Sequence, residues 1–161
     1  MNELFFLLIE SMKEEAVCYR RLALLARDQK ELLLVGNVDA LKENARLQEK
    51  QVFALTPIIG RREEILSNVA KTLGAKKMNL NEAVQKAPVG VADDFKKVLS
   101  DLIQAAKELA AINSLSGKLL DNAIAFTNFT MKAIRDGGKK KSFSMAVAAE
   151  DNKSSFVNRV V

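Results

Sequence analysis

Three long stretches of this chain place apolar residues at alternating steps of three and four. This spacing puts the repeated positions on one face of a helix, which is the pattern of an amphipathic α-helix. The 161 residues include only 7 glycines and 2 prolines, a composition typical of long helices rather than of a sandwich or barrel. Such helices bury their apolar faces only against each other. The sequence therefore predicts an all-α fold, an elongated antiparallel bundle of three long helices with coiled-coil-like packing.

The first stretch predicts one helix over residues 2–34. Gly36 and Asn37 follow it and suit the end of that helix and the N-cap of the next one. Only Glu15 and Gln29 are polar within the first apolar stripe. The stripe otherwise consists of Phe5, Leu8, Met12, Tyr19, Leu22, Ala26 and Leu33.

The second stretch predicts a helix over residues 38–73 that ends at Gly74. Pro57 lies inside this helix and removes one backbone hydrogen bond. Because the apolar stripe keeps its register on both sides of Pro57, we expect a kinked helix, and a true break at this proline is the alternative. The stripe consists of Leu41, Ala45, Gln48, Val52, Leu55, Ile59, Arg62, Leu66, Val69 and Leu73.

The linker over residues 75–91 predicts irregular chain with one short helix near 80–87. The third stretch is the longest, and about 44 helical residues would give a rod of roughly 65 Å. Asp93 and Asp94 suit the first turn of this helix, because acidic side chains stabilise a helix N-terminus. Gly137 suits its end.

Residues 137–161 lose the helical period and carry a net charge of +3, from five basic and two acidic side chains. We therefore expect a helical domain over residues 1–136 and a flexible, disordered basic tail over 137–161. The helical part is close to charge balance, whereas a nucleic-acid-binding domain would carry a basic stripe on its folded surface. We expect a solubilising tail and no nucleic-acid partner.

The apolar runs of the chain are shorter than a targeting signal or a membrane span requires. The run over residues 4–9 is too short for a signal peptide and has acidic flanks. No uninterrupted apolar stretch approaches the ~20 residues that span a bilayer. We expect a cytoplasmic protein without stable membrane insertion.

Composition also argues against catalysis and metal binding. The chain has no histidine, which is the commonest general base and metal ligand, and its single cysteine is Cys18. We expect Cys18 to be a small, semi-buried thiol rather than a reactive one. Neighbouring carboxylates on a helix diverge by about 100° and cannot share a substrate, so we expect solvated surface and no enzyme, cofactor or metal. These pairs are Glu14–Glu15, Glu63–Glu64 and Asp93–Asp94.

The end of the third stretch carries more apolar surface than a bundle needs. Its apolar sector spans about 220°, against the ~100–140° of a bundle-facing helix. The excess suits an amphipathic partner helix or a dimer contact. Asn113 and Ser116 interrupt this stripe, and they either fix register inside the bundle or bond to the backbone of a partner. The apolar residues are Leu119, Leu120, Ala123, Ile124, Phe126, Phe129 and Met131.

Several segments occur in a recognisable order. The first two predicted helices contain YRRLALLARDQKELL (19–33), GNVDAL (36–41) and RREEIL (61–66), and the third contains an asparagine followed by apolar pairs over 112–126. This order resembles the FlgN-type family of flagellar export chaperones across the predicted helical domain. Ser116 stands where that family usually has a second asparagine.

The resemblance implies a cytoplasmic, non-enzymatic chaperone of flagellar type III secretion. Such a protein binds the C-terminal helical segment of hook-filament junction (hook-associated) proteins and delivers these clients to the export gate. The resemblance together with the wide apolar sector predicts a client contact at Asn113, Ser116 and the seven apolar residues of the third helix, of which Phe129 and Met131 rest on the apolar sector alone. The tail has no tyrosine, so an aromatic contact with the export gate would use Phe143 or Phe156.

Other interpretations stay open. The chain could be a coiled-coil scaffold or assembly protein that homo-oligomerises through the apolar surface of the third helix. A weaker interpretation is nucleic-acid binding through the basic tail. That tail is either an inert extension or a segment that becomes ordered on a partner. We expect the free protein to be a monomer or a weak homodimer.

Overall fold

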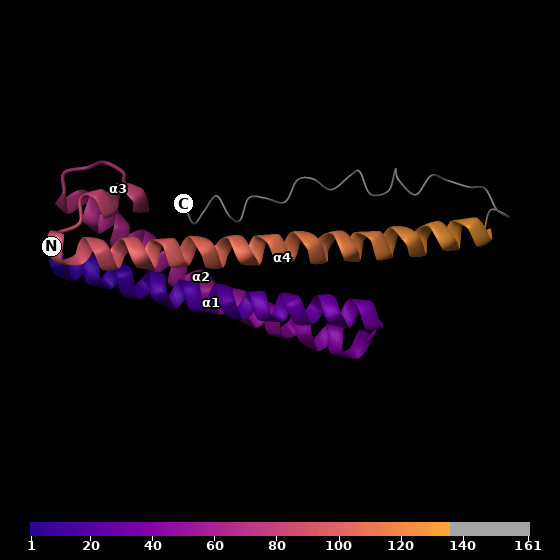
Figure 1. The fold of residues 1–161 in the computed structure, drawn as a ribbon. Coiled ribbons are helices and arrows are strands. Elements are labelled where there is room, and N and C mark those ends of the chain that lie inside the picture. The colour runs from indigo at the N-terminus through magenta and orange to yellow at the C-terminus, as the bar shows by residue number, and fades with distance from the viewer. Residues whose placement is uncertain (136–161) are drawn as a thin grey trace.

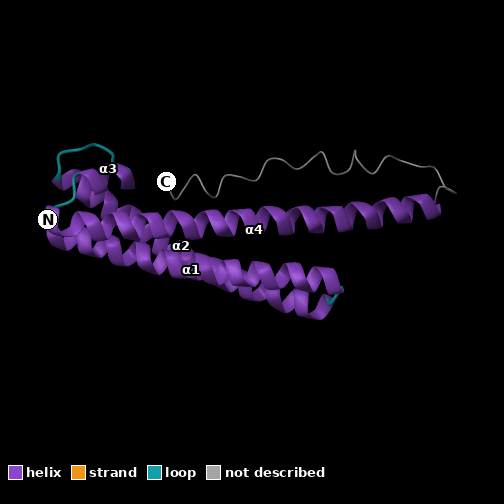
Figure 2. Ribbon diagram, in the orientation of Figure 1, coloured by secondary structure: helices purple, strands orange, loops and turns teal. Residues whose placement is uncertain are grey.

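The computed structural model describes the backbone of residues 1–135 and the side chains of residues 1–113. Within this range the regular elements are all helices, which confirms the predicted all-α fold (Figure 2). They are α1 (Asn2–Val35), α2 (Val38–Thr72), α3 (Leu80–Gln85) and α4 (Val89–Arg135). The predicted tail over residues 137–161 lies outside the described residues, and so do Phe143 and Phe156.

The turn between α1 and α2 forms as predicted. Gly36 ends α1 in the left-handed conformation at φ 68°, and its N–H donates to the Leu33 carbonyl at 3.3 Å. Asn37 caps α2, because its side chain accepts from the backbone N–H of Ala40 at 3.1 Å. Two residues therefore suffice to send α2 back along α1 as an antiparallel hairpin.

Helix α2 is continuous through Pro57, so the alternative of a break at this residue is wrong. Proline has no N–H to donate to the carbonyl of Phe53. The hydroxyl of Thr56, the residue directly before Pro57, donates to the carbonyl of Val52 at 3.0 Å. The helix therefore tolerates the missing backbone bond, as the unbroken apolar stripe predicted.

The short helix α3 lies within the predicted range 80–87, at Leu80–Gln85. It starts with a capping box: the Asn79 side chain accepts from the backbone N–H of Glu82 at 2.9 Å, and the Glu82 carboxylate accepts from the Asn79 N–H at 3.1 Å. The capping box was not predicted, although an asparagine three residues before a glutamate is its usual signal.

Helix α4 begins earlier than the sequence predicts. It starts at Val89, directly after Pro88, whose carbonyl accepts from the N–H of Val91 at 2.8 Å. The first N–H groups of any helix lack partners within it, so a preceding proline costs nothing here. Asp93 and Asp94 consequently lie in the second turn, and their prediction as first-turn residues was wrong.

Helix α1 is the central element of the bundle. It packs along both α2 and α4, whereas in the described part of the chain the α2 and α4 backbones do not approach each other closely. In Figure 1, α4 runs in the same direction as α1, which confirms the up-down-up order. The edge-to-face contact of Phe5 with Phe95, with ring centroids 6.0 Å apart, joins the starts of α1 and α4.

The burial pattern of α1 explains this central place. Its buried positions come in neighbouring pairs, which together cover about half of the helix circumference at ~100° per residue. A helix that packs against one neighbour buries a narrower stripe, so two neighbours are needed to cover α1. The pairs are Leu8–Ile9, Ser11–Met12, Glu15–Ala16, Cys18–Tyr19 and Leu22–Ala23.

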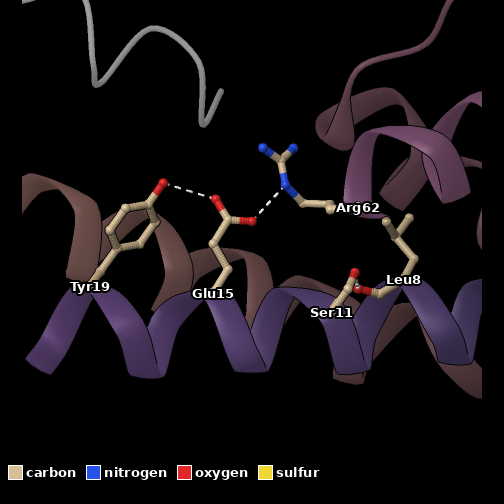
Figure 3. Close-up of polar contacts among 5 residues, drawn as sticks. All are labelled: Leu8, Ser11, Glu15, Tyr19 and Arg62. Atoms are coloured by element: carbon tan, nitrogen blue, oxygen red, sulfur yellow. Dashed lines mark hydrogen bonds and ion pairs between the residues drawn. The ribbon is translucent and has the colours of Figure 1, made fainter. Parts of the chain in front are cut away.

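A buried ion pair joins α1 to α2. The Arg62 guanidinium donates from Nε to Glu15 Oε2 at 2.6 Å, and both side chains are buried (Figure 3). The hydroxyl of Tyr19 donates to the other carboxylate oxygen of Glu15 at 2.9 Å. The expectation that Glu15 is solvated surface was therefore wrong, because α2 brings a cation to a carboxylate that lies within the apolar stripe.

A second polar layer lies two heptads nearer the turn. The side chain of Gln48 donates to Gln29 Oε1 at 3.1 Å and to Asn44 Oδ1 at 2.6 Å, and Asn44 donates to the carbonyl of Leu25 at 2.8 Å. Glu15 and Gln29 are fourteen residues apart on α1, as are Gln48 and Arg62 on α2. Both layers thus specify one register of the hairpin, because a shift along the helices would leave all four side chains unpaired.

Burial dominates the electrostatics of the first layer. It raises the pKa of the Glu15 carboxyl above its usual value, although Arg62 and the Tyr19 hydrogen bond act in the opposite direction. Burial and the neighbouring Glu15 charge also raise the pKa of the Tyr19 phenol, which keeps its proton and stays a donor. The layer is therefore a structural contact and not a source of reactive groups.

Two adjacent arginines provide a matched test of this layer. Arg62→Ala should lower the free energy of unfolding by about 3 kcal/mol or more, because Glu15 would stay buried without its cation. Arg61→Ala should cost less than about 1 kcal/mol, since Arg61 pairs with Glu14 at 3.2 Å on the exposed surface. Urea denaturation followed by circular dichroism measures both. Equal losses in the two variants would contradict a register set by the buried pair.

The raised pKa of Glu15 predicts a pH dependence. A carboxyl whose folded pKa lies above its unfolded value of 4.5 stabilises the fold below that value, and this contribution is lost as the pH rises through the folded pKa. The stability of wild type relative to Glu15→Gln should therefore grow as the pH is lowered from about 8 toward about 4.5. A relative loss of wild-type stability in acid would mean that Arg62 attraction outweighs burial.

Candidate binding surface on helix α4

The described residues contain little that could support catalysis. They hold no group of three or more His, Cys, Asp or Glu side chains placed to bind a metal ion. Cys18 is buried as a small thiol, at 5% exposure, and burial raises its pKa, so it is not activated. In this same part of the chain, no helix has both the length and the apolar content needed to cross a bilayer.

The remaining carboxylate pairs are solvent-exposed, as the sequence predicts. Glu63, Glu64, Asp93 and Asp94 are all exposed. A shallow hollow between α1 and α4 is lined by Lys13, Asp94, Lys97, Val98, Ser100, Asp101 and Gln104. Its charges are of both signs and Asp101 is already paired with Arg20, so the hollow offers no single-sign site for a ligand.

The first part of α4 is a bundle helix. Its buried residues repeat at steps of three and four and pack against the central helix α1. They are Val91, Phe95, Leu99, Leu102, Ala105, Ala106 and Leu109. This part of α4 therefore fixes the direction in which the rest of the helix extends.

The second part of α4, residues 114–135, continues as one helix with the first. With 47 residues against 34 in α1, α4 is roughly 20 Å longer at ~1.5 Å per residue. Figure 1 shows that α4 diverges from the α1–α2 hairpin and extends past its turn. Burial along α1 agrees, since its last buried residue is Ala26, well before the helix ends. The end of α4 thus leaves the bundle.

The predicted client-binding residues lie on this part of α4, except Asn113, which directly precedes it. Asn113 is exposed, so its amide does not fix register inside the bundle, which was one of its two proposed roles. That role belongs instead to the polar layers between α1 and α2. Along the helical backbone beyond Asn113 lie Ser116, Leu119, Leu120, Ala123, Ile124, Phe126, Phe129 and Met131. Their side chains lie outside the described residues, and their contact with a client stays a prediction.

The polar residues of these layers were noted in the sequence, but their pairing between α1 and α2 was not predicted. The first two predicted apolar stripes each carried two polar members, with Glu15 and Gln29 on the first and Gln48 and Arg62 on the second. Their equal separation of fourteen residues, and the opposite charges of Glu15 and Arg62, are signals that could have paired them.

Comparison with known protein families matches residues 1–145 to the family described as FlgN protein. Comparison with curated proteins and with solved structures gave no significant match. The family match covers all four helices, including the part of α4 that leaves the bundle. FlgN is a family of chaperones and not of enzymes, in agreement with the sequence-based expectation. The chain therefore belongs to the FlgN family of flagellar export chaperones.

Proposed function

We propose that this chaperone acts in the cytoplasm, where it binds the C-terminal helical segment of hook-associated proteins and delivers them to the export gate. The client segment lies along residues 114–135 of α4. The observation that carries this proposal is the course of α4, which stays helical to Arg135 after it has left the α1–α2 hairpin (Figure 1). Membership of the FlgN family supports the general role.

The physical argument rests on apolar area. In the first part of α4, apolar side chains are covered by α1. The second part carries an apolar sector of about 220°, which is wider than a contact with one neighbouring helix covers. The shorter helix α1 also ends before α4 does, so it cannot cover the last turns of α4. An amphipathic client helix laid along this part would bury the surplus, and each large side chain covered contributes about 1.5–3 kcal/mol.

The residues divide into four roles. Leu119, Leu120 and Ala123 form the centre of the contact, and the larger side chains on its two flanks hold the client helix in place. These flanking residues are Ile124, Phe126, Phe129 and Met131. Asn113 and Ser116 bond to the client backbone, and the exposure of the Asn113 side chain supports this role. Phe143 and Phe156 in the tail contact the export gate.

Truncation of the two flanking aromatics tests the client surface. Phe126→Ala with Phe129→Ala should leave the helical circular dichroism intact but weaken client binding by at least ~2 kcal/mol, which is about 30-fold in affinity. Calorimetric titration with the C-terminal segment of a hook-associated protein measures the loss.

The matched control removes two exposed apolar side chains elsewhere. Phe6→Ala with Leu7→Ala, at 53% and 50% exposure on α1, should leave client affinity unchanged. If the Phe126/Phe129 variant instead unfolds, while its affinity per folded molecule equals that of wild type, both phenylalanines are core residues and the client binds elsewhere.

Deletion of residues 139–161 tests the role of the tail. Client affinity should stay nearly unchanged, because the proposed client surface ends before the deletion, whereas secretion of the client should be abolished. Calorimetry and a secretion assay in cells carrying the truncation measure the two quantities separately. Normal secretion would leave the tail as solvated chain, and lost client binding would place the tail in the client contact.

A further inference from the structure

The middle of α2, residues 51–60, lacks charged residues and exposes apolar side chains on its outward face. These ten residues, QVFALTPIIG, contain no charged side chain, whereas charged residues are frequent in α2 before and after them. Val52 is 44% exposed and Phe53 is 75% exposed. A phenylalanine this exposed in the middle of a long helix leaves apolar area in water that none of the described side chains covers.

Two further residues on this face are unfavourable in the isolated chain. Pro57 is exposed and removes a helical hydrogen bond. Gly60 is exposed too, and a Cβ added there would meet no atom within 4 Å, so no contact among the described residues requires a glycine. Glycine in a helix interior is nevertheless less stable than alanine. Phe53, Pro57 and Gly60 are spaced by four and three, so they share one face, which points away from α1 and from buried Arg62.

We propose that this face of α2 binds the same face of a second copy of the chain, with the two α2 helices antiparallel about a two-fold axis that crosses them at the height of residue 55, on the side of α2 opposite the buried Leu55 side chain. In such an isologous contact, each residue i of one copy lies level with residue 110 − i of the other. Phe53 then lies level with Pro57 of the second copy. Because helical side chains lean toward the N-terminus of their own helix, the Phe53 ring extends over Gly60 of the second copy, where the missing side chain leaves room.

Charge complementarity favours a second copy and selects the antiparallel arrangement. Beyond the two ends of the uncharged segment, Arg46 of one copy lies level with Glu64 of the second copy. Because the contact is symmetric, the same pair also forms between Glu64 of the first copy and Arg46 of the second. In a parallel pair, each residue would lie level with the same residue of the second copy. Arg46 would then face Arg46, Glu49 would face Glu49 and Glu64 would face Glu64, and these like charges would repel each other. Arg46 already bonds to Glu43 at 2.7 Å and 2.9 Å, but that pair is exposed and its guanidinium can be shared.

This contact is compatible with the surface proposed for the client. The self-associating face is the side of α2 remote from α1, and α4 packs on α1 rather than on α2. A single pair of helices buries little area compared with obligate dimers, so we expect weak and reversible association. The inference does not depend on the proposed function, because it uses only residues of α2.

Sedimentation velocity over about 10 µM to about 1 mM protein tests the interface on the full chain. Wild type should shift from monomer toward dimer across this range, and Phe53→Ala should weaken the association at least ~10-fold. The matched control Phe6→Ala removes another exposed phenylalanine, on α1, and should associate like wild type. Wild type that stays monomeric throughout, or equal effects of the two variants, would overturn the proposal.

Charge reversal tests the register. Arg46→Glu and Glu64→Arg should each abolish self-association, because each sets like charges against each other twice. An equimolar mixture of the two variants should associate, because in the mixed dimer the side chain at position 46 of either copy faces the opposite charge at position 64 of the other. Failure of the mixture to associate, or association of the single variants at wild-type strength, would overturn this register and with it the proposed interface.

Gly60→Ala separates the interface from chain stability. Alanine should raise the Tm of the dilute monomer, since it is the better helix former and has space, while it weakens the association by filling the room for the Phe53 ring. A higher Tm with unchanged association would show that Phe53 does not seat at Gly60 and would contradict the proposed packing.

Discussion

The buried contact of Glu15 with Arg62 determines how α2 lies along α1, and the rest of the bundle is arranged around that hairpin. At 2.6 Å and with both side chains buried, the pair can form in one register only. Apolar side chains of similar volume could stabilise the hairpin as well, so the importance of the pair is specificity rather than net stability. The Gln29–Gln48 layer repeats the constraint two heptads away.

This register leaves α1 with a second buried face, and α4 packs there. The result is a bundle in which one central helix carries two neighbours that do not pack closely on each other within the described residues. Because α4 is longer than α1 and diverges from it, a rigid bundle ends in a single projecting helix (Figure 1). Under the proposed function, that arrangement suits a helical client, because the bundle would hold the projecting helix without competing for its surface.

Much of this architecture follows from periodicity, and the rest depends on which elements meet. The extents of α1 and α2, the Gly36–Asn37 turn and the continuity through Pro57 are local properties, and the sequence predicts them. The pairing of Glu15 with Arg62 was missed because the spacing of apolar residues shows which face of a helix is buried, but not which residues of another helix that face contacts. The start of α4 was missed because Pro88 and Gly90 were taken as linker residues, although a helix N-terminus tolerates both.

The candidate surface on α4 was likewise predicted only in part from the sequence. The excess of apolar residues after Asn113 is visible in the sequence, and the structure adds that this part of the helix extends beyond the hairpin. Hydrogen-deuterium exchange of the chaperone with and without a client C-terminal segment tests this account most directly. We expect added protection within residues 114–135 of α4 and unchanged exchange in α1 and α2. Protection concentrated in the α1–α2 hairpin, with none in 114–135, would contradict it.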